Sequence, residues 1–176
     1  MKKNTIKYII GLTIIVALRL IPHPPNTEPI MTTMMPFSRK WGKWSGLVFG
    51  VLAIIAYDFL TQTLGVWTLI TATSYGLLGL LAGIYFSKQK GNNVWGYVTF
   101  AVVGTLLYDA FTGFTIGPLF FYQSFSEAFF GQIPFTLYHL SGNVVLSFIL
   151  SPLIYQWVIA NPKLETNYIM QKLALK

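Results

Sequence analysis

Three ionisable side chains interrupt long apolar stretches, and they are the first candidates for binding a solute. Arg19, Asp58 and Asp109 each lie near the end of such a stretch. A charged group within a membrane is costly unless it reaches water, a partner or a ligand. The two aspartates could therefore contact a ligand, or be solvated or hydrogen-bonded to a neighbouring Thr or Tyr. Arg19 could pair with Asp58, Asp109 or Glu28, or bind a carboxylate or phosphate of a solute through its guanidinium.

Two sets of uncharged polar residues share the i, i+3, i+7 spacing that places side chains on one face of a helix. They are Thr136, His139 and Asn143 in one stretch, and Thr68, Thr71 and Tyr75 in another. Such stripes either join helices through hydrogen bonds or line a polar cavity. Both stripes lie toward the half of their stretches that is expected to face outward, which favours a cavity.

The motifs of known enzyme classes are incomplete in this sequence. His139 and Asn143 form an H-x-x-x-N pair that resembles one motif of the intramembrane CAAX-type proteases, but the paired glutamates of those enzymes are missing. Ser141 beside His139 does not by itself place a nucleophile and a base in hydrogen-bond geometry. Two histidines in separate elements and no cysteine give no metal-ligand spacing. We therefore expect no enzymatic activity, no cofactor and no metal.

The composition excludes a soluble domain. Charged residues make up 10% of the sequence, against about 25% in an average soluble domain, and hydrophobic residues make up 54%. The formal net charge is +7, but the basic residues are scattered between apolar runs. This scatter is typical of membrane topology signals rather than of a nucleic-acid-binding face. We expect one all-α integral membrane domain over residues 1–176, without nucleic acid as a partner.

The apolar stretches predict a bundle of six membrane-spanning helices, at roughly 8–21, 29–38, 44–61, 66–86, 94–111 and 133–160. The second is short and contains Pro29 and Pro36. If it crosses, every Lys and Arg except Arg19 lies on one side of the membrane together with both termini. Because basic loops mark the cytoplasmic side, we expect a multi-pass protein of the plasma membrane with both termini in the cytoplasm. Such a short crossing segment must be shielded by longer neighbours, so we expect it inside the bundle.

The third and fifth predicted spans carry a common pattern at an offset of 51 residues. The pattern indicates a duplicated helical hairpin whose two copies run in the same direction. The matched pairs are Trp44 and Trp95, Phe49 and Phe100, Tyr57 and Tyr108, Asp58 and Asp109, and Thr61 and Thr112.

Two connections and one glycine spacing add further expectations. Residues 21–29 hold four prolines and predict a rigid outer cap, and the Phe-rich residues 113–132 suit an interfacial helix or a lid. Gly46 and Gly50 have the small-x-x-x-small spacing that allows close helix approach. This spacing favours packing within the bundle, with docking of another membrane subunit as the alternative.

With these features the chain resembles the substrate-binding S components of energy-coupling factor (ECF) vitamin transporters, in particular small members with an Arg-x-x-Pro-His-Pro-Pro-Asn segment. Here that segment runs from Arg19 to Asn26. The resemblance covers nearly the whole chain, with six spans, cytoplasmic termini, a capping first outer loop and basic inner loops such as 39–43. One departure is that residues 8–20 lack the Ala-x-x-x-Ala patch with which many S components dock their coupling subunit. Gly46 and Gly50 could take that role.

The resemblance implies capture of a vitamin or related micronutrient in a pocket near the outer face. Energy would come from a membrane coupling subunit and two ATPase subunits, since this chain has no phosphate loop. The pocket would map onto Arg19, Asn26, Asp58, Tyr75, Asp109, His139 and Asn143. The alternative is a membrane scaffold whose polar stripes join helices and whose basic loops dock a cytoplasmic partner. An intramembrane hydrolase that depends on His139 is a third hypothesis.

Overall fold

The computed structural model describes residues 4–22 and 26–174, and within these ranges it holds helices and no strand. The residues Lys2, Lys3, His23, Pro24, Pro25 and Lys176, on which the topology and the resemblance partly depend, lie outside the described residues. The helices follow in the order α1 (Thr5–Leu20), α2 (Pro29–Trp41), α3 (Lys43–Leu60), α4 (Val66–Ser87), α5 (Val94–Phe120), α6 (Phe125–Ile154), the π-helical η1 (Tyr155–Ile159), the 3-10 helix η2 (Pro162–Leu164) and α7 (Thr166–Ala174).

Four helices are long and apolar enough to cross a membrane. They are α3, α4, α5 and the continuous helix formed by α6 and η1. They overlap the predicted spans at 44–61, 66–86, 94–111 and 133–160, and α5 and α6 extend beyond the predicted bounds. The prediction of an all-helical chain with helices long and apolar enough to cross a membrane is thus confirmed. The helix α1 has 16 residues and α2 has 13. At 1.5 Å per residue they measure about 24 and 20 Å, less than the roughly 30 Å of a hydrocarbon core.

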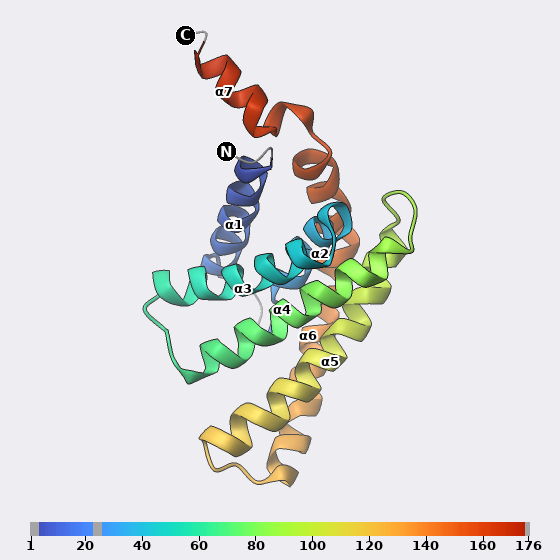
Figure 1. Cartoon of the computed structure of the whole chain (residues 1–176). Helices are drawn as coiled ribbons and strands as arrows, with labels where there is room; N and C mark the ends of the chain where they lie inside the picture. The colour runs from blue at the N-terminus through green and yellow to red at the C-terminus, as the bar shows by residue number, and fades with distance from the viewer. Residues whose placement is uncertain (1–3, 23–25, 175–176) are drawn as a thin grey trace.

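The chain reverses between two ends of the molecule, as Figure 1 shows. The two described chain ends and the 88–93 connection lie in the upper half of this view, the 61–65 connection lies at the left near middle height, and the 121–124 connection lies at the bottom. The Lys and Arg residues of the 88–93 connection and of the C-terminal segment are therefore at one end, away from the 121–124 connection. This arrangement agrees with the prediction that the basic connections lie on one side of the membrane. The number of spans stays a prediction.

The short helix α2 is the core of the bundle. Every residue from Pro29 to Ser38 is buried, and α2 packs against α3, α4 and α6. The prediction that this segment lies inside the bundle is confirmed. Two of its hydroxyls bond within the helix, because Thr33 Oγ1 donates to Pro29 O at 2.9 Å and Ser38 Oγ donates to Met34 O at 3.1 Å. These bonds satisfy polar groups that have no access to water.

A proline inside α2 is compensated by a neighbouring helix. Pro36 has no N–H, so it cannot donate to the carbonyl of Thr32, four residues earlier. Ser151 of α6 donates its Oγ hydrogen to this carbonyl at 2.8 Å. The hydroxyl of Thr32 in turn lies 3.2 Å from the hydroxyl of Ser147. The proline is therefore tolerated in the core because α6 replaces the hydrogen bond that it removes.

Glycines bring α3 and α4 into backbone contact. A methyl group on Gly46 would collide with the carbonyl of Gly79, and one on Gly50 would collide with the carbonyl of Tyr75. Both Gly46 and Gly50 are buried in this contact. The expectation that they dock a coupling subunit is therefore wrong, because α4 already covers the face that they form. Their spacing serves packing within the bundle.

The residues expected to form a separate lid instead extend two helices. The helix α5 continues to Phe120 and α6 begins at Phe125, so only 121–124 connect them, at the lower end of Figure 1. Ser124 starts α6 with a capping box, in which Glu127 N donates to Ser124 Oγ at 3.3 Å and Ser124 N donates to Glu127 Oε2 at 2.8 Å. The prediction of an interfacial helix or lid at 113–132 is wrong because this local signal starts a long helix.

The two members of the sequence repeat agree in helix pairing, in one threonine hydrogen bond and in burial. The pairs α3 with α4 and α5 with α6 have the most extensive contacts among the helices. Thr61 Oγ1 donates to Tyr57 O and Thr112 Oγ1 donates to Tyr108 O, both at 2.8 Å. The remaining matched pairs also agree, with Trp44 and Trp95 exposed, Phe49 and Phe100 buried, and Asp58 and Asp109 buried.

Candidate solute-binding site

Arg19, near the end of α1, is paired with Glu28, which precedes α2. The Arg19 Nε lies 3.3 Å from Glu28 Oε2, and Arg19 Nη2 donates to Glu28 Oε1, also at 3.3 Å. The guanidinium carbon lies 3.7 Å from the centre of the Tyr57 ring, a cation–π contact. Of the alternatives left open by the sequence, the structure contains the pairing with Glu28. Arg19 Nη1 is buried and has no hydrogen-bond partner among the described residues.

Asp109 of α5 and His139 of α6 form a buried pair. The Asp109 Oδ1 and the His139 Nδ1 are 2.7 Å apart, and each side chain is 1% exposed. A carboxylate accepts hydrogen bonds, so the Nδ1 carries the proton in this pair. The imidazole ring meets the ring of Tyr108 edge-on, with 5.8 Å between their centres. Asp109 Oδ2 and His139 Nε2 are both buried, with no hydrogen-bond partner in the described ranges.

One helical turn away, earlier in α5 and later in α6, a second polar pair repeats this arrangement. Asn143 Nδ2 donates to Thr105 Oγ1 at 2.8 Å, and both side chains are fully buried. The other amide atom, Asn143 Oδ1, has no hydrogen-bond partner in the described part of the chain. The stripe predicted from the spacing of His139 and Asn143 therefore faces α5, where both residues bond to buried polar groups.

Two tyrosine rings form the wall between α4 and α5. The rings of Tyr75 and Tyr108 lie 4.5 Å apart at an angle of 40°. The hydroxyl of Tyr75 is buried and has no hydrogen-bond partner among the residues described. Arg19, Glu28 and Asp109 are electrostatic neighbours of both rings.

Asp58 lies at the border of this cluster. Thr68 Oγ1 donates to Asp58 Oδ2 at 2.6 Å, while Gly65 N donates to the same Thr68 hydroxyl at 3.0 Å. The carboxylate thus helps to fix the start of α4, which is the hydrogen-bonded alternative considered for this residue. Asp58 is also an electrostatic neighbour of Tyr108, so it contributes charge to the cluster.

Asn26 contributes through its backbone. Its φ is 60°, in the left-handed region that Asn tolerates better than most residues. The following residue, Thr27, packs closely against Gly142 of α6, next to Asn143. Asn26 therefore turns the chain so that Glu28 follows at the site.

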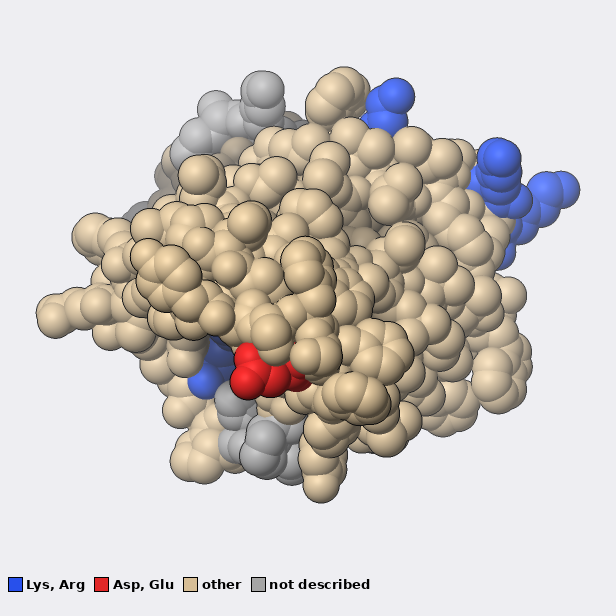
Figure 2. All heavy atoms as spheres, turned by 90° about the horizontal axis from the view of Figure 1, so that it is seen from below, with Lys and Arg blue, Asp and Glu red and all other residues tan. Residues whose placement is uncertain are grey.

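A hollow of about 440 Å³ opens beside the cluster between α4, α5 and α6. Its lining includes Tyr108, Thr112, Gln132 and Phe135, together with Thr71 of the predicted stripe on α4. Seen from this end, most of the surface is uncharged (Figure 2). Acidic and basic atoms adjoin each other below and to the left of the centre, and further basic side chains lie at the upper right edge. The hollow thus offers a weakly charged approach to Tyr108, whose ring contacts both Tyr75 and His139.

Three further residues of the site were not among the candidates. Tyr57 and Tyr108 precede the two aspartates in the repeat, and this shared Tyr-Asp pair was the signal that could have identified them. Thr105 lies four residues before Asp109, on the same face of a helix, and that spacing was its signal. The six candidates Arg19, Asp58, Tyr75, Asp109, His139 and Asn143 otherwise lie in one contiguous cluster.

The chain was compared with protein-family models, with curated proteins and with solved structures, and none of the three comparisons finds a match. The resemblance to ECF S components therefore depends on the sequence motif and on the predicted topology. Function must be argued from the site itself.

Proposed function

We propose that this chain is the substrate-binding subunit of an ECF-type transporter. In this proposal it has six spans, lies in the plasma membrane with both termini in the cytoplasm, and captures a vitamin or related micronutrient from the outer face. It performs no chemical step, and uptake is driven by a membrane coupling subunit and two ATPase subunits.

One observation carries the proposal: of the ten buried side-chain polar atoms that lack a hydrogen-bond partner among the described residues, six belong to this cluster. They are Arg19 Nη1, Glu28 Oε2, Tyr75 OH, Asp109 Oδ2, His139 Nε2 and Asn143 Oδ1, and the other four belong to Arg39, Gln89, Asn92 and Tyr97. Leaving such a group unsatisfied costs about 1 to 3 kcal/mol, and native proteins contain few of them. A solute that bonds to several of these atoms at once would recover that free energy.

The way each residue is bonded favours a ligand over a purely structural role. Arg19, Asp109, His139 and Asn143 each use one polar atom to bond a neighbouring residue and keep another unbonded. The second atom is then available to a ligand. The observed bonds hold each side chain in a fixed orientation, as a preorganised binding site requires.

The charges and rings of the site indicate the chemistry of the solute. Three carboxylates, those of Glu28, Asp58 and Asp109, accompany one guanidinium, that of Arg19, around the rings of Tyr75 and Tyr108. A surplus of buried negative charge is costly unless a positive group compensates it. Aromatic faces also attract cations. We therefore expect a small solute that has a planar ring and a positively charged group.

The proposed orientation follows from the basic residues. Arg39, Lys40 and Lys43 flank the junction of α2 and α3, and Lys88 and Lys90 follow α4. Arg19 belongs to the other end, where Glu28 neutralises it. An excess of Lys and Arg in short loops is the usual mark of the cytoplasmic side. The hollow beside the site would then face the outside of the cell, as capture from there requires.

Thermal unfolding of the detergent-purified protein against a panel of vitamins and nucleobase-like compounds tests the proposal. A ligand at 100 times its dissociation constant adds about 2.7 kcal/mol of stability. We expect one strong stabiliser, whose effect is lost in Tyr75→Phe and kept in Thr73→Ala, a matched change on the exposed side of α4. If no compound in the panel stabilises the protein although it is folded, the scaffold alternative would be favoured. Copurification with a coupling subunit and ATPases tests the predicted partners separately.

A further inference from the structure

The C-terminal helix α7 is fixed to the start of the bundle. Ile6 N, in the first turn of α1, donates to Thr166 Oγ1 at 3.2 Å, and the Thr166 side chain is buried. The first turn of a helix has N–H groups without partners in its own helix, so Thr166 acts as a distant cap for α1. Nearby, Lys7 Nζ donates to Ile159 O at 2.8 Å, where the long helix of α6 and η1 ends. The helix α7 therefore begins level with two membrane-helix ends.

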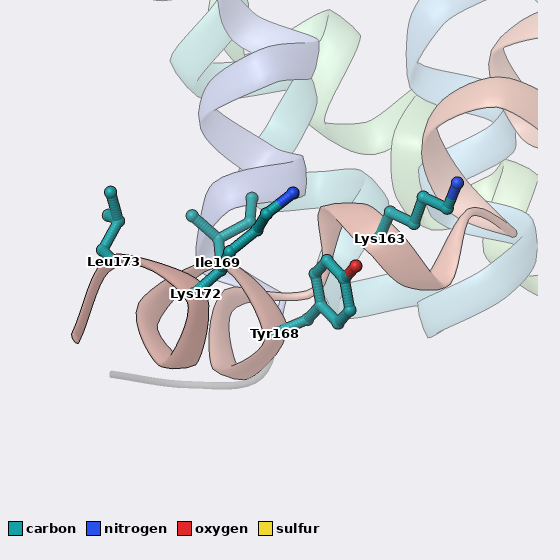
Figure 3. A pocket seen from close by; sticks show the side chains of 5 residues that line it. All are labelled: Lys163, Tyr168, Ile169, Lys172 and Leu173. Carbon is teal, nitrogen blue, oxygen red and sulfur yellow. The ribbon is translucent and has the colours of Figure 1, made fainter. Parts of the chain in front are cut away.

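The helix α7 carries several apolar side chains and one basic side chain, Lys172, beside them. Ile169, Met170 and Leu173 share one face at helical spacing, and Met170 and Leu173 are 49% and 63% exposed. Figure 3 shows Ile169, Lys172 and Leu173 pointing from α7 toward the side on which α1 stands. A helix of this kind is typical of segments that lie in the interface plane of a membrane.

A hollow of about 360 Å³ lies against this helix, lined by Lys163, Tyr168, Ile169, Lys172 and Leu173. Two ammonium groups and a phenol supply hydrogen-bond donors, and Ile169 and Leu173 supply an apolar wall. In Figure 3 the hydroxyl of Tyr168 points toward Lys163. Lysine is a common phosphate-binding residue. A free phosphate would use the basic part of this hollow and leave the apolar wall exposed.

We propose that this hollow binds the headgroup of an anionic phospholipid in the adjacent leaflet. Lys163 and Lys172 bind the phosphate, Tyr168 donates a hydrogen bond, and Ile169 and Leu173 contact the glycerol and the first acyl carbons. The lipid would cover apolar side chains that the rest of the chain leaves exposed. This site is independent of the proposed solute site, which lies at the opposite end of the bundle.

The test uses the absence of cysteine from the sequence. A Met170→Cys variant carries an environment-sensitive fluorophore and is placed in nanodiscs of phosphatidylcholine, with or without phosphatidylglycerol. We expect phosphatidylglycerol to shift the emission to the blue and the K163Q/K172Q change to abolish that shift. Each lysine removed should weaken the preference for the anionic lipid about fivefold. The matched K88Q/K90Q change, which removes the same charge from another connection, should leave the shift intact.

Three outcomes would overturn the proposal. They are equal emission in both lipids, a shift that persists in K163Q/K172Q, or an equal shift produced in detergent by soluble glycerophosphoglycerol, which has no acyl chains. Native mass spectrometry of the unlabelled protein provides a second measurement. The wild-type chain should retain phosphatidylglycerol that K163Q/K172Q loses, with solute binding the same in both.

Discussion

The Nδ1 of His139 lies 2.7 Å from the Oδ1 of Asp109, and this pair joins α5 to α6 where both helices are closed to solvent. Removing one partner of a buried pair leaves the other uncompensated, at a cost of about 3 to 5 kcal/mol. We predict a loss of this size in the unfolding free energy of His139→Ala. Ser141→Ala, an exposed change on the same helix, should stay within about 0.5 kcal/mol. Equal stability of the two variants in denaturant unfolding would contradict the role of the pair.

A conservative change at Asp58 separates charge from hydrogen bonding. Asp58→Asn keeps an oxygen that accepts the hydrogen of Thr68, so stability should change by less than about 1 kcal/mol. Binding of a positively charged solute should weaken about tenfold or more, the loss expected for one charge-assisted contact. Titration calorimetry with the identified ligand measures this effect. Unchanged affinity would remove Asp58 from the site.

Arg19 should not be replaceable by Lys. The guanidinium combines the contact with Glu28 and the stacking on Tyr57, and an ammonium group cannot provide both geometries. We predict that Arg19→Lys lowers the unfolding free energy by about 1 to 2 kcal/mol. It should also weaken solute binding, because Nη1 is lost. A fully stable variant with normal binding would show that only the positive charge at this position matters.

The close contact of α3 and α4 makes a prediction about glycine substitution. Gly79→Ala should destabilise the protein by about 1 to 3 kcal/mol, because the new methyl group meets the backbone of Gly46. Gly131→Ala is the matched control, since nothing lies within 4 Å of the added Cβ. That change in a helix should be neutral or stabilise by up to about 1 kcal/mol. Melting temperatures in one detergent compare the two variants.

The compensated proline in α2 can be tested by a double-mutant cycle. Ser151→Ala leaves the carbonyl of Thr32 unbonded and should cost about 1 to 3 kcal/mol. Pro36→Ala restores an N–H four residues after Thr32, so Ser151→Ala should cost much less in that background. Additive effects of the two changes on the unfolding free energy would mean that the Ser151 bond does not replace the one lost at Pro36.

The apolar runs predicted the long helices because the hydrophobic period and the length of an apolar stretch depend only on the local sequence. The position of α2 in the core also followed from the sequence, since a crossing segment as short as 29–38 needs longer neighbours to shield it from lipid. The connection at 113–132 was mispredicted because its aromatic content was weighted above the capping box of Ser124 and Glu127. That signal was present in the sequence.

The composition of the site was more predictable than its pairing. Spacing placed His139 and Asn143 on one face, and the cost of buried charge identified Asp109. That Asp109 bonds His139 and that Asn143 bonds Thr105 depends on the register of α5 against α6, which no single-helix pattern contains. The docking role of Gly46 and Gly50 failed for the same reason, because a small-residue spacing does not specify which helix approaches it.

The burial of α2 has a consequence for biogenesis. This helix leaves the ribosome before α3, α4 and α6, which are the helices that cover it. Its prolines and hydroxyls make it a poor candidate for entering lipid alone, so it must wait beside the insertion machinery until the later hairpins are made. Nascent chains that end before α6 should expose this segment to proteases and quality control. The bundle is thus assembled around a helix that is synthesised early and integrated late.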